Sequence, residues 1–409
     1  MSDTTVYRHR DFVFFSVGRF LSTVAMMVQS VAIGWQIYDM EKTPLALGLV
    51  GLCQFAPMFL FTLPAGELAD RFDQRKVLAG ALVLQGLCGG LFLALSIFAV
   101  KEAIAYYAVL VLFGVGRGFA SPSGQSLLPF LVPKERLPRA IALNSSVFMV
   151  SVIAGPALGG FLYAFGPKAT YSICLINFLV AAALMALVGG RRAKKVDLDA
   201  SRLERVKEGV RFVRHRPVIF GAISLDLFAV LLGGATALLP VYARDILHTG
   251  PQGLGLLRSA PAIGAAVVAL WLARRPIERK IGTKMFGAVA IFGVATIVFG
   301  LSTNFWISLA ALAVLGASDM ISVFVRQSLV TFATPDDMRG RVGAVNMLFI
   351  GASNELGEFE SGFTAALLGP VLAVVIGGFG TLAVVATWMK LFPPLRTVDR
   401  LKDVKVERA

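Results

Sequence analysis

Residues 155–160 read GPALGG, and residues 357–362, which lie 202 positions further along the chain, read GEFESG. At the same offset, 14 of the 52 residues between 114 and 165 are identical to their counterparts, for example Asn144 to Asn346. A frame shared over this length indicates that the chain contains two copies of one structural unit. The positions at which the two copies differ are therefore the first places to look for function.

Apolar residues dominate the composition. Of the 409 residues, 56% are hydrophobic and 16% are charged, which is more apolar surface than a water-soluble domain could bury. Apolar runs of roughly 20 residues, the length that crosses a ~30 Å hydrocarbon core as a helix, recur along the chain. They cover residues 12–38, 46–69, 77–99, 103–131, 139–165, 170–189, 217–243, 252–273, 284–301, 304–332, 341–368 and 370–391. The sequence predicts an all-α membrane protein with twelve transmembrane helices in two pseudo-symmetric six-helix bundles.

The net charge of +14 follows the predicted topology. If residue 1 is cytoplasmic, 31 of the 39 Lys and Arg residues fall on the cytoplasmic side, four on the other side and four within helices. This is the distribution that the positive-inside rule describes, so the charge needs no nucleic-acid partner. We expect a multi-pass protein of the inner membrane with both termini in the cytoplasm.

One long polar segment divides the chain. Residues 190–216 carry ten basic and four acidic residues, and apolar residues recur at helical spacing within 201–215. This pattern predicts an amphipathic helix on the anionic inner leaflet, with a solvated linker as the alternative. The expected domains are an N-terminal six-helix bundle (1–189), this basic linker, a C-terminal six-helix bundle (217–392) and a cytoplasmic tail (393–409).

Sites for other kinds of chemistry are not visible in the sequence. Cys53, Cys88 and Cys174 all fall inside predicted helices, and the three histidines lie outside the predicted membrane core. No G-x-x-x-x-G-K-[ST] sequence is present, which argues against ATP hydrolysis by this chain. We expect no metal and no cofactor, and the chain is not expected to be an enzyme.

The stretch GELADRFDQRKVL, residues 66–78, joins two apolar runs. It resembles the signature between helices 2 and 3 of the major facilitator superfamily, with Gly66, Asp70, Arg71 and Arg75 at matching positions. Asp73 stands where that family usually has glycine. Gly66 would allow a close helix contact and Asp70 could pair with a basic group or a helix N-terminus, which predicts a conformational latch. The alternative is that the basic residues only anchor the loop at the inner face.

The segment SVIAGPALGG, residues 151–160, lies in the predicted helix 139–165. It resembles the Gly-Pro element of exporters and drug–proton antiporters of the same superfamily. Glycines let helices touch, and a proline removes one backbone hydrogen bond, so Gly155, Pro156, Gly159 and Gly160 are predicted to form a flexible seam. Close helix packing without gating is the alternative.

The stretch ASNELGEFESG, residues 352–362, and the chain's ending resemble the bacterial group that includes the enterobactin exporter and drug efflux proteins. The resemblance implies a secondary active transporter that exports an organic small molecule, such as a siderophore, drug or metabolite, by alternating access and proton antiport. An importer or facilitator on the same fold is the nearest alternative, and a polytopic membrane enzyme is a remote one. Apart from substrate, protons and the lipid bilayer no partner is expected, and the protein is expected to be a monomer.

Charged and polar residues inside the predicted helices are the candidates for proton coupling or for lining a substrate cavity. Unpaired charges at the bilayer centre are costly, so such residues are unlikely to face lipid. The candidates are Arg19, Arg117, Asp226, Asp319, Arg326, Asn354, Glu355, Glu358 and Glu360. Glu355 or Glu358 is our first hypothesis for the group that titrates, because carboxylates can be charged or neutral in turn. Asp226 is the second candidate, and structural ion pairing is the alternative, especially for Asp319 with Arg326 on the same helix face.

Overall fold

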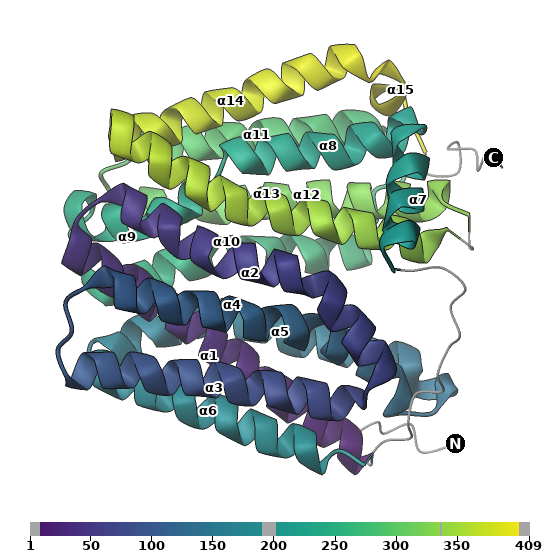
Figure 1. Cartoon of the computed structure of the whole chain (residues 1–409). Helices are drawn as coiled ribbons and strands as arrows, with labels where there is room; N and C mark the ends of the chain where they lie inside the picture. The colour runs from purple at the N-terminus through teal and green to yellow at the C-terminus, as the bar shows by residue number, and fades with distance from the viewer. Residues whose placement is uncertain (1–8, 190–201, 336–337, 401–409) are drawn as a thin grey trace. The chain divides into compact units, whose positions relative to one another are not determined.

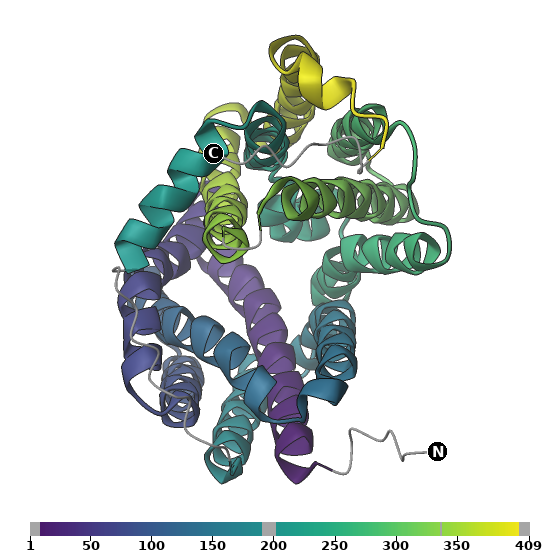
Figure 2. The same ribbon diagram turned by 90° about the vertical axis from the view of Figure 1, so that its right-hand side faces the viewer.

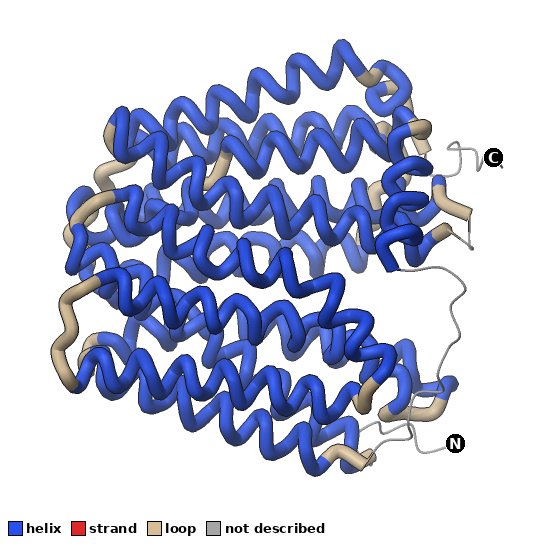
Figure 3. The backbone as a smooth tube through the Cα atoms, in the orientation of Figure 1, coloured by secondary structure: helices blue, strands red, loops and turns tan. Residues whose placement is uncertain are grey.

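The computed structural model describes residues 9–189, 202–335 and 338–400, and every regular element within these ranges is a helix (Figure 3). The long helices are α1 (Arg10–Glu41), α2 (Pro44–Arg71), α3 (Gln74–Ile97), α4 (Ala103–Leu127), α5 (Leu137–Tyr163), α6 (Pro167–Leu187), α8 (Pro217–Leu232), α10 (Gly250–Arg274), α11 (Ile281–Leu301), α12 (Phe305–Ala333), α13 (Arg339–Leu368) and α14 (Pro370–Leu391). Shorter helices are α7 (Arg202–Arg214), α9 (Leu239–Val241) and α15 (Pro393–Arg396).

Each predicted apolar run corresponds to one of the long helices. In the described part of the chain, 11 helices are long and apolar enough to cross a membrane, with the segment Pro217–Ile246 taken as one span. The remaining long helix is α13, whose 30 residues extend for ~45 Å but include Glu355, Glu358 and Glu360. The predicted all-α membrane fold is confirmed.

The helix predicted over 217–243 is interrupted, which the apolar pattern alone does not reveal. α8 ends at Leu232, and a short 3₁₀ turn, α9 and a π-helical turn follow. A Cβ atom on Gly234 would lie 2.6 Å from the carbonyl oxygen of Gly357 on α13. The chain therefore passes so close to α13 at this point that only glycine fits without a shift.

The chain forms two compact units. Unit 1 comprises residues 1–42, 52–198 and 250–259, and unit 2 comprises residues 43–51, 199–249 and 260–409. The main change of unit falls within the polar segment 190–216. The start of α2 (43–51) belongs to unit 2, although the rest of α2 belongs to unit 1. The start of α10 (250–259) belongs to unit 1, although the rest of α10 belongs to unit 2.

In unit 1, α1 packs against α5 and α6, and α3 packs against α4 and α6 (Figure 1). A polar link lies among these apolar helices. Tyr171 donates a hydrogen bond of 2.6 Å to Oε1 of Gln36, whose Nε2 donates one of 2.8 Å to the hydroxyl of Tyr106. The ring of Phe92 contacts both tyrosine rings. These contacts connect α1, α3, α4 and α6 and satisfy the half-buried amide of Gln36.

In unit 2, α11 packs against α12 and α14, and α8 packs against α13 and α14 (Figure 1). Two hydrogen bonds join segments of this unit, one between α14 and α8 and one between the π-helical turn and α11. Nε1 of Trp388 donates to the Ser224 hydroxyl at 3.0 Å, and the hydroxyl of Tyr242 donates to the carbonyl oxygen of Gly300 at 2.9 Å. The apolar interior around them includes Leu225 and Leu329, so unit 2 has its own hydrophobic core.

The repeated frame reappears as repeated helix contacts. Gly155 of α5 packs closely on α1, and its counterpart Gly357 of α13 packs closely on α8. Gly160 of α5 lies against the start of α10 within unit 1, and its counterpart Gly362 lies against the start of α2 within unit 2. The same positions thus mediate close packing in both copies, as small residues do between membrane helices.

The helix expected within 201–215 is present as α7, which runs across the ends of α8 and α13 (Figure 2). Val213 is buried in an apolar cluster of unit 2. Nη1 of Arg341 pairs with Oε2 of Glu208 at 3.1 Å, and Gly209 lies against the backbone of Arg341. At least part of the apolar face of α7 therefore packs on protein.

Candidate functional site

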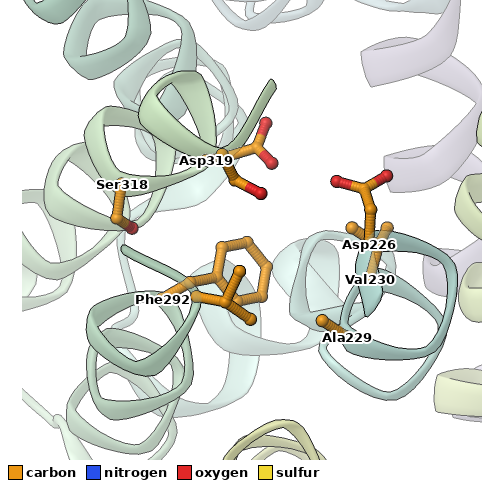
Figure 4. Close-up of a pocket in the computed structure, with 8 residues that line it drawn as sticks. Asp226, Ala229, Val230, Phe292, Ser318 and Asp319 are labelled. Atoms are coloured by element: carbon orange, nitrogen blue, oxygen red, sulfur yellow. The ribbon is translucent and has the colours of Figure 1, made fainter. Parts of the chain in front are cut away.

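A small cavity lies inside unit 2 between α8, α11 and α12, with an empty volume of about 210 Å³. Its lining combines acidic, hydroxyl and apolar side chains. The lining residues are Asp226, Ala229, Val230, Val289, Phe292, Ser318, Asp319 and Ser322. Figure 4 shows the carboxylates of Asp226 and Asp319 pointing toward one another across this space.

A buried ion pair adjoins the cavity through Asp226. Nη1 of Arg326 lies 3.1 Å from Oδ2 of Asp226, and their side chains are only 2% and 6% exposed. The same nitrogen donates a hydrogen bond of 3.2 Å to Oδ1 of Asn346 on α13. Nε of Arg326 and Oγ of Ser322 are buried without a hydrogen-bond partner in the structure. The site therefore has unused hydrogen-bonding capacity of the kind that an ordered water satisfies.

Helical spacing explains why α12 contributes several of these groups. Asp319, Ser322 and Arg326 are three and seven residues apart, so they share one face of the helix. Asp226 comes from α8, where it lies among buried apolar neighbours. The ion pair of Arg326 is thus with Asp226 on another helix. Pairing with Asp319 on its own helix was the alternative that the sequence left open, and it stays a prediction. Residues seven apart lie ~10.5 Å apart along a helix axis, so a charge on a facing helix is nearer.

The cluster contains two carboxylic acids and one guanidinium. If both acids are ionised, the cluster carries a net charge of −1 in a place with little access to water. Buried charges are tolerated only when they are paired and hydrogen-bonded. One proton or one small cation at Asp226 and Asp319 would neutralise the cluster, so its composition suits reversible binding of a single positive charge.

The glutamates of α13 do not line this cavity. Glu358 packs on the start of α2, where a Cβ atom on Gly51 would lie 2.9 Å from its Oε2 atom. Oε1 of Glu360 accepts a hydrogen bond of 2.8 Å from Thr364 on the same helix. Glu355 is half-buried. Asn354 is exposed and donates to the carbonyl oxygen of Ile350 one turn earlier. The three glutamates are therefore distributed around α13, and their role in coupling stays a prediction.

The two candidate arginines of unit 1 lie on separate helices. Arg117 is half-buried on α4. Arg19 is half-buried on α1, and its guanidinium lies over the ring of Phe148 on α5 at 5.9 Å from the ring centroid. Nε of Arg19 is buried without a hydrogen-bond partner in the structure. Neither arginine belongs to the cavity of unit 2.

The predicted seam lies on α5, which runs as one helix from Leu137 to Tyr163 through Pro156. Gly155 and Gly159 face α1, and Gly160 faces the start of α10. All four seam residues are buried. Close packing at these glycines is therefore observed, and gating by the seam stays a prediction.

The predicted latch falls largely outside the described side chains, because those of Gly66, Asp70 and Arg71 are not among them. The side chain of Arg75 is described. It binds the carboxylate of Asp73, with 2.6 Å between Nη2 and Oδ2, and donates a hydrogen bond of 2.8 Å to the carbonyl oxygen of Val188. Arg75 thus joins the loop between α2 and α3 to the end of α6.

Three polar residues of the site, Ser318, Ser322 and Asn346, were not singled out from the sequence. Asn346 matches Asn144 in the repeated frame, so its retention in both copies was the available signal. Ser322 gave no signal, because single hydroxyl residues are common in membrane helices. Among the described residues, no group of three or more His, Cys, Asp or Glu side chains could hold a metal ion.

Comparison with known proteins places the whole chain in one family. The family model described as transmembrane secretion effector, within the major facilitator superfamily, matches residues 2–407. The enterobactin exporter EntS of Citrobacter koseri is 28% identical over 389 residues, which cover 93% of this chain and 91% of that protein. EntS of Escherichia coli O1:K1 / APEC is 26% identical over 377 residues, which cover 90% of this chain and 88% of that protein.

Solved structures support the same fold. A bacterial homologue of the human lysosomal transporter Spinster has a TM-score of 0.74 at 13% identity, covering 96% of this chain and 99% of the other. A bacterial homologue of the iron transporter ferroportin has a TM-score of 0.72 at 18% identity, covering 96% of this chain and 100% of the other. The chain belongs to the transmembrane secretion effector family of the major facilitator superfamily, and it is a multi-pass inner-membrane transporter of a small molecule, not an enzyme.

Proposed function

We propose that this transporter exports an organic small molecule from the cytoplasm by alternating access, in exchange for protons. The observation that carries the coupling proposal is the buried cluster of Asp226, Asp319 and Arg326 in unit 2. Both termini would lie in the cytoplasm, as the distribution of basic residues suggests. The protein would act as a monomer, with the exposed basic residues of α7 facing anionic head groups.

Export is supported by the relatives that match nearly the full chain, which are exporters of enterobactin. The substrate of those relatives is a siderophore, so a siderophore is one candidate cargo here, beside drugs and metabolites. The Gly-Pro element of α5, Gly155 to Gly160, is the part of the sequence that supports export independently of these matches.

Proton exchange is supported by the charge balance of the cluster. Arg326 can neutralise one carboxylate, and its ion pair of 3.1 Å assigns that role to Asp226. The carboxyl group of Asp319 faces the same cavity and has no second guanidinium among the residues that line it. Proton binding at Asp319 would change the charge of the cluster during the cycle, whereas transfer of the Arg326 pairing from Asp226 to Asp319 would only change which carboxylate is unpaired.

The size of the cavity also favours a proton or a water over the organic substrate. Pockets for drug-sized ligands hold about 300–1,000 Å³. The space here that a water-sized sphere can occupy is about 10 Å³, which is about enough for one water. We therefore assign this cavity to coupling and not to cargo binding.

The direction of transport is tested by accumulation of a compound panel in cells. The panel contains siderophores, lipophilic drugs and metabolites, and the strains either lack the gene or overproduce the protein. Export predicts that at least one compound accumulates less in the overproducing strain and more in the deletion strain. Higher accumulation on overproduction would identify an importer and would contradict the proposal.

The residue that carries the proton is tested with the compound found in that panel. We expect Asp319→Asn and Asp226→Asn to abolish proton-driven export, and Glu360→Gln to leave it intact. The rival hypothesis predicts instead that Glu355→Gln or Glu358→Gln abolishes it. Full proton-driven export in both aspartate variants would exclude the cluster as the coupling site.

A further inference from the structure

Arg19 is an arginine of a predicted membrane helix, and no carboxylate of the described residues pairs with it. It lies in the first third of α1 in unit 1 and is half-buried. Its guanidinium contacts the ring of Phe148 on α5, and its Nε atom is buried without a hydrogen-bond partner. Within the described residues, no Asp or Glu side chain pairs with it.

Other unsatisfied polar atoms lie on the same helix faces. Ser16 is three residues before Arg19 on α1, and Asn144 is four residues before Phe148 on α5, so each pair shares a face. Oγ of Ser16 and Oδ1 of Asn144 are both buried without a hydrogen-bond partner. α1 and α5 pack along one another in unit 1. The two helices therefore present hydrogen-bonding groups and one positive charge whose partners are missing.

The repeat explains how this place relates to the cluster of unit 2. In the 202-residue frame, Gly124 corresponds to Arg326, and Asn144 corresponds to Asn346. A Cβ atom on Gly124 would lie 3.5 Å from Nη1 of Arg19. The guanidinium of Arg19 thus lies beside the position from which Arg326 projects in the other copy, although it comes from a different helix.

The two copies differ in what neutralises the guanidinium. In unit 2, Arg326 binds Asp226 and Asn346, both contributed by the protein. In unit 1, Oδ1 of Asn144 is buried without a partner, and no carboxylate among the described residues pairs with Arg19. A buried guanidinium without a counter-ion is unfavourable, so an anion supplied from outside would stabilise this place.

We infer that Arg19 binds the anionic group of the transported molecule, and that the ring of Phe148 packs against an aromatic or flat apolar part of it. The inference rests on the proposed export function and assigns its substrate class: an organic anion with an aromatic portion. The ring of Phe148 is 41% exposed, so it is accessible to such a molecule. A guanidinium can form two parallel hydrogen bonds to a carboxylate and can also stack on a ring, which a lysine does less well.

The test uses 1-naphthoate and its neutral counterpart 1-naphthamide as probes of the purified full-length protein in nanodiscs. Calorimetric titration measures the Kd of each compound. We expect wild-type protein to bind the acid at least tenfold more tightly than the amide. The Arg19→Gln variant should bind the two compounds equally, and Arg19→Lys should retain part of the preference.

Arg10→Gln is the matched control, because Arg10 lies on the same helix and over a phenylalanine ring, Phe14 at 4.8 Å, but is exposed. This variant should keep the wild-type preference. Equal binding of acid and amide by wild-type protein, absence of naphthoate binding, or an unchanged preference in Arg19→Gln would each overturn the inference. Arg19→Lys keeps the charge. If it retains part of the preference for the acid, the preference lost in Arg19→Gln reflects the missing charge and not misfolding.

The outcome is separable from that of the coupling proposal. If Arg19→Gln leaves naphthoate binding unchanged while Asp319→Asn removes proton-driven export, the substrate assignment fails and the proposed function stands. If naphthoate binding depends on Arg19 but transport moves no protons, the substrate assignment stands and the coupling proposal fails.

Discussion

The guanidinium of Arg326 connects three helices of unit 2, because it is held on α12, pairs with Asp226 on α8 and donates to Asn346 on α13. Arg326→Gln should lower the free energy of unfolding by roughly 3–5 kcal/mol, since it leaves a buried carboxylate without its counter-ion. Denaturant or thermal unfolding of purified protein measures this change.

The double variant Asp226→Asn/Arg326→Gln is the control for that prediction. Removing both charges keeps the net charge of the cluster as it is in wild type and leaves neither position with an unpaired charge, so the double variant should be more stable than Arg326→Gln alone. If the double variant is destabilised by the sum of the two single changes, the two residues do not interact as an ion pair.

Asp73 gives a prediction about pH, because it caps the N-terminus of α3. Hydrogen bonds from the side chain and backbone of Arg75 lower the pKa of its carboxyl group. A lowered pKa in the folded state contributes stability above the unfolded pKa of about 3.9, and this contribution is lost as the pH falls through the folded value. Asp73→Ala should therefore cost about 1 kcal/mol near pH 7 and progressively less below about pH 4.

Thermal unfolding of wild type and Asp73→Ala at several pH values checks this prediction. Glu102→Ala is the matched control, because Glu102 occupies the same position before α4 but makes no side-chain hydrogen bond to cap that helix. A difference between wild type and Asp73→Ala that persists undiminished well below pH 4 would contradict the proposed role of the carboxylate.

At the scale of the elements, α7 is held on α13 by a close contact at Gly209. A Cβ atom there would lie 2.7 Å from the carbonyl oxygen of Arg341, so Gly209→Val should displace α7 from α13. We expect amide exchange in α7 to rise at least tenfold, measured by hydrogen–deuterium exchange. Lys207→Ala, on the exposed side of the same helix, should leave exchange unchanged. Unchanged exchange in Gly209→Val would mean that α7 does not depend on this contact.

The break after α8 gives a second prediction at this scale. Gly234→Ala should destabilise the protein by about 1–3 kcal/mol, because the new methyl group would overlap the carbonyl oxygen of Gly357. Gly351→Ala on α13 is the control, since a Cβ atom there would contact nothing within 4 Å. Thermal unfolding measures both, and equal stability of the two variants would contradict the close approach.

Most of the helices could be predicted from the sequence, because a membrane-spanning helix requires a continuous apolar run whatever it packs against. The amphipathic spacing of 201–215 also predicted α7. The break at Gly233 and Gly234 could not be predicted, because it depends on the approach of α13 from elsewhere in the chain. A sequence pattern predicts the helix that its own residues form, whereas this break involves packing against a distant part of the chain.

At the scale of the whole molecule, the same distinction applies to the candidate site. The sequence identified Asp226, Asp319 and Arg326 as intramembrane charges, but it did not reveal the ion pair between Arg326 and Asp226. Partner choice depends on which helices face one another, which a single sequence does not specify. The repeat did carry further information, since the match of Asn144 with Asn346 pointed to corresponding positions in both units.

The duplication suggests a division of roles between the units, in which one copy contains its own counter-ion and the other obtains one from the cargo. Arg326 is neutralised by Asp226, whereas Arg19 has no carboxylate among the described residues. On this account, unit 2 exchanges protons and unit 1 recognises the anion.

The central claim is tested most directly by reconstituting purified wild type and Asp319→Asn in liposomes and imposing a pH gradient. The substrate is the compound that the accumulation panel identifies. We predict that wild-type protein accumulates it against its concentration gradient only when the pH gradient is present, whereas Asp319→Asn still exchanges it down a gradient but does not accumulate it. Equal pH-driven accumulation by the variant and by wild type would contradict the account.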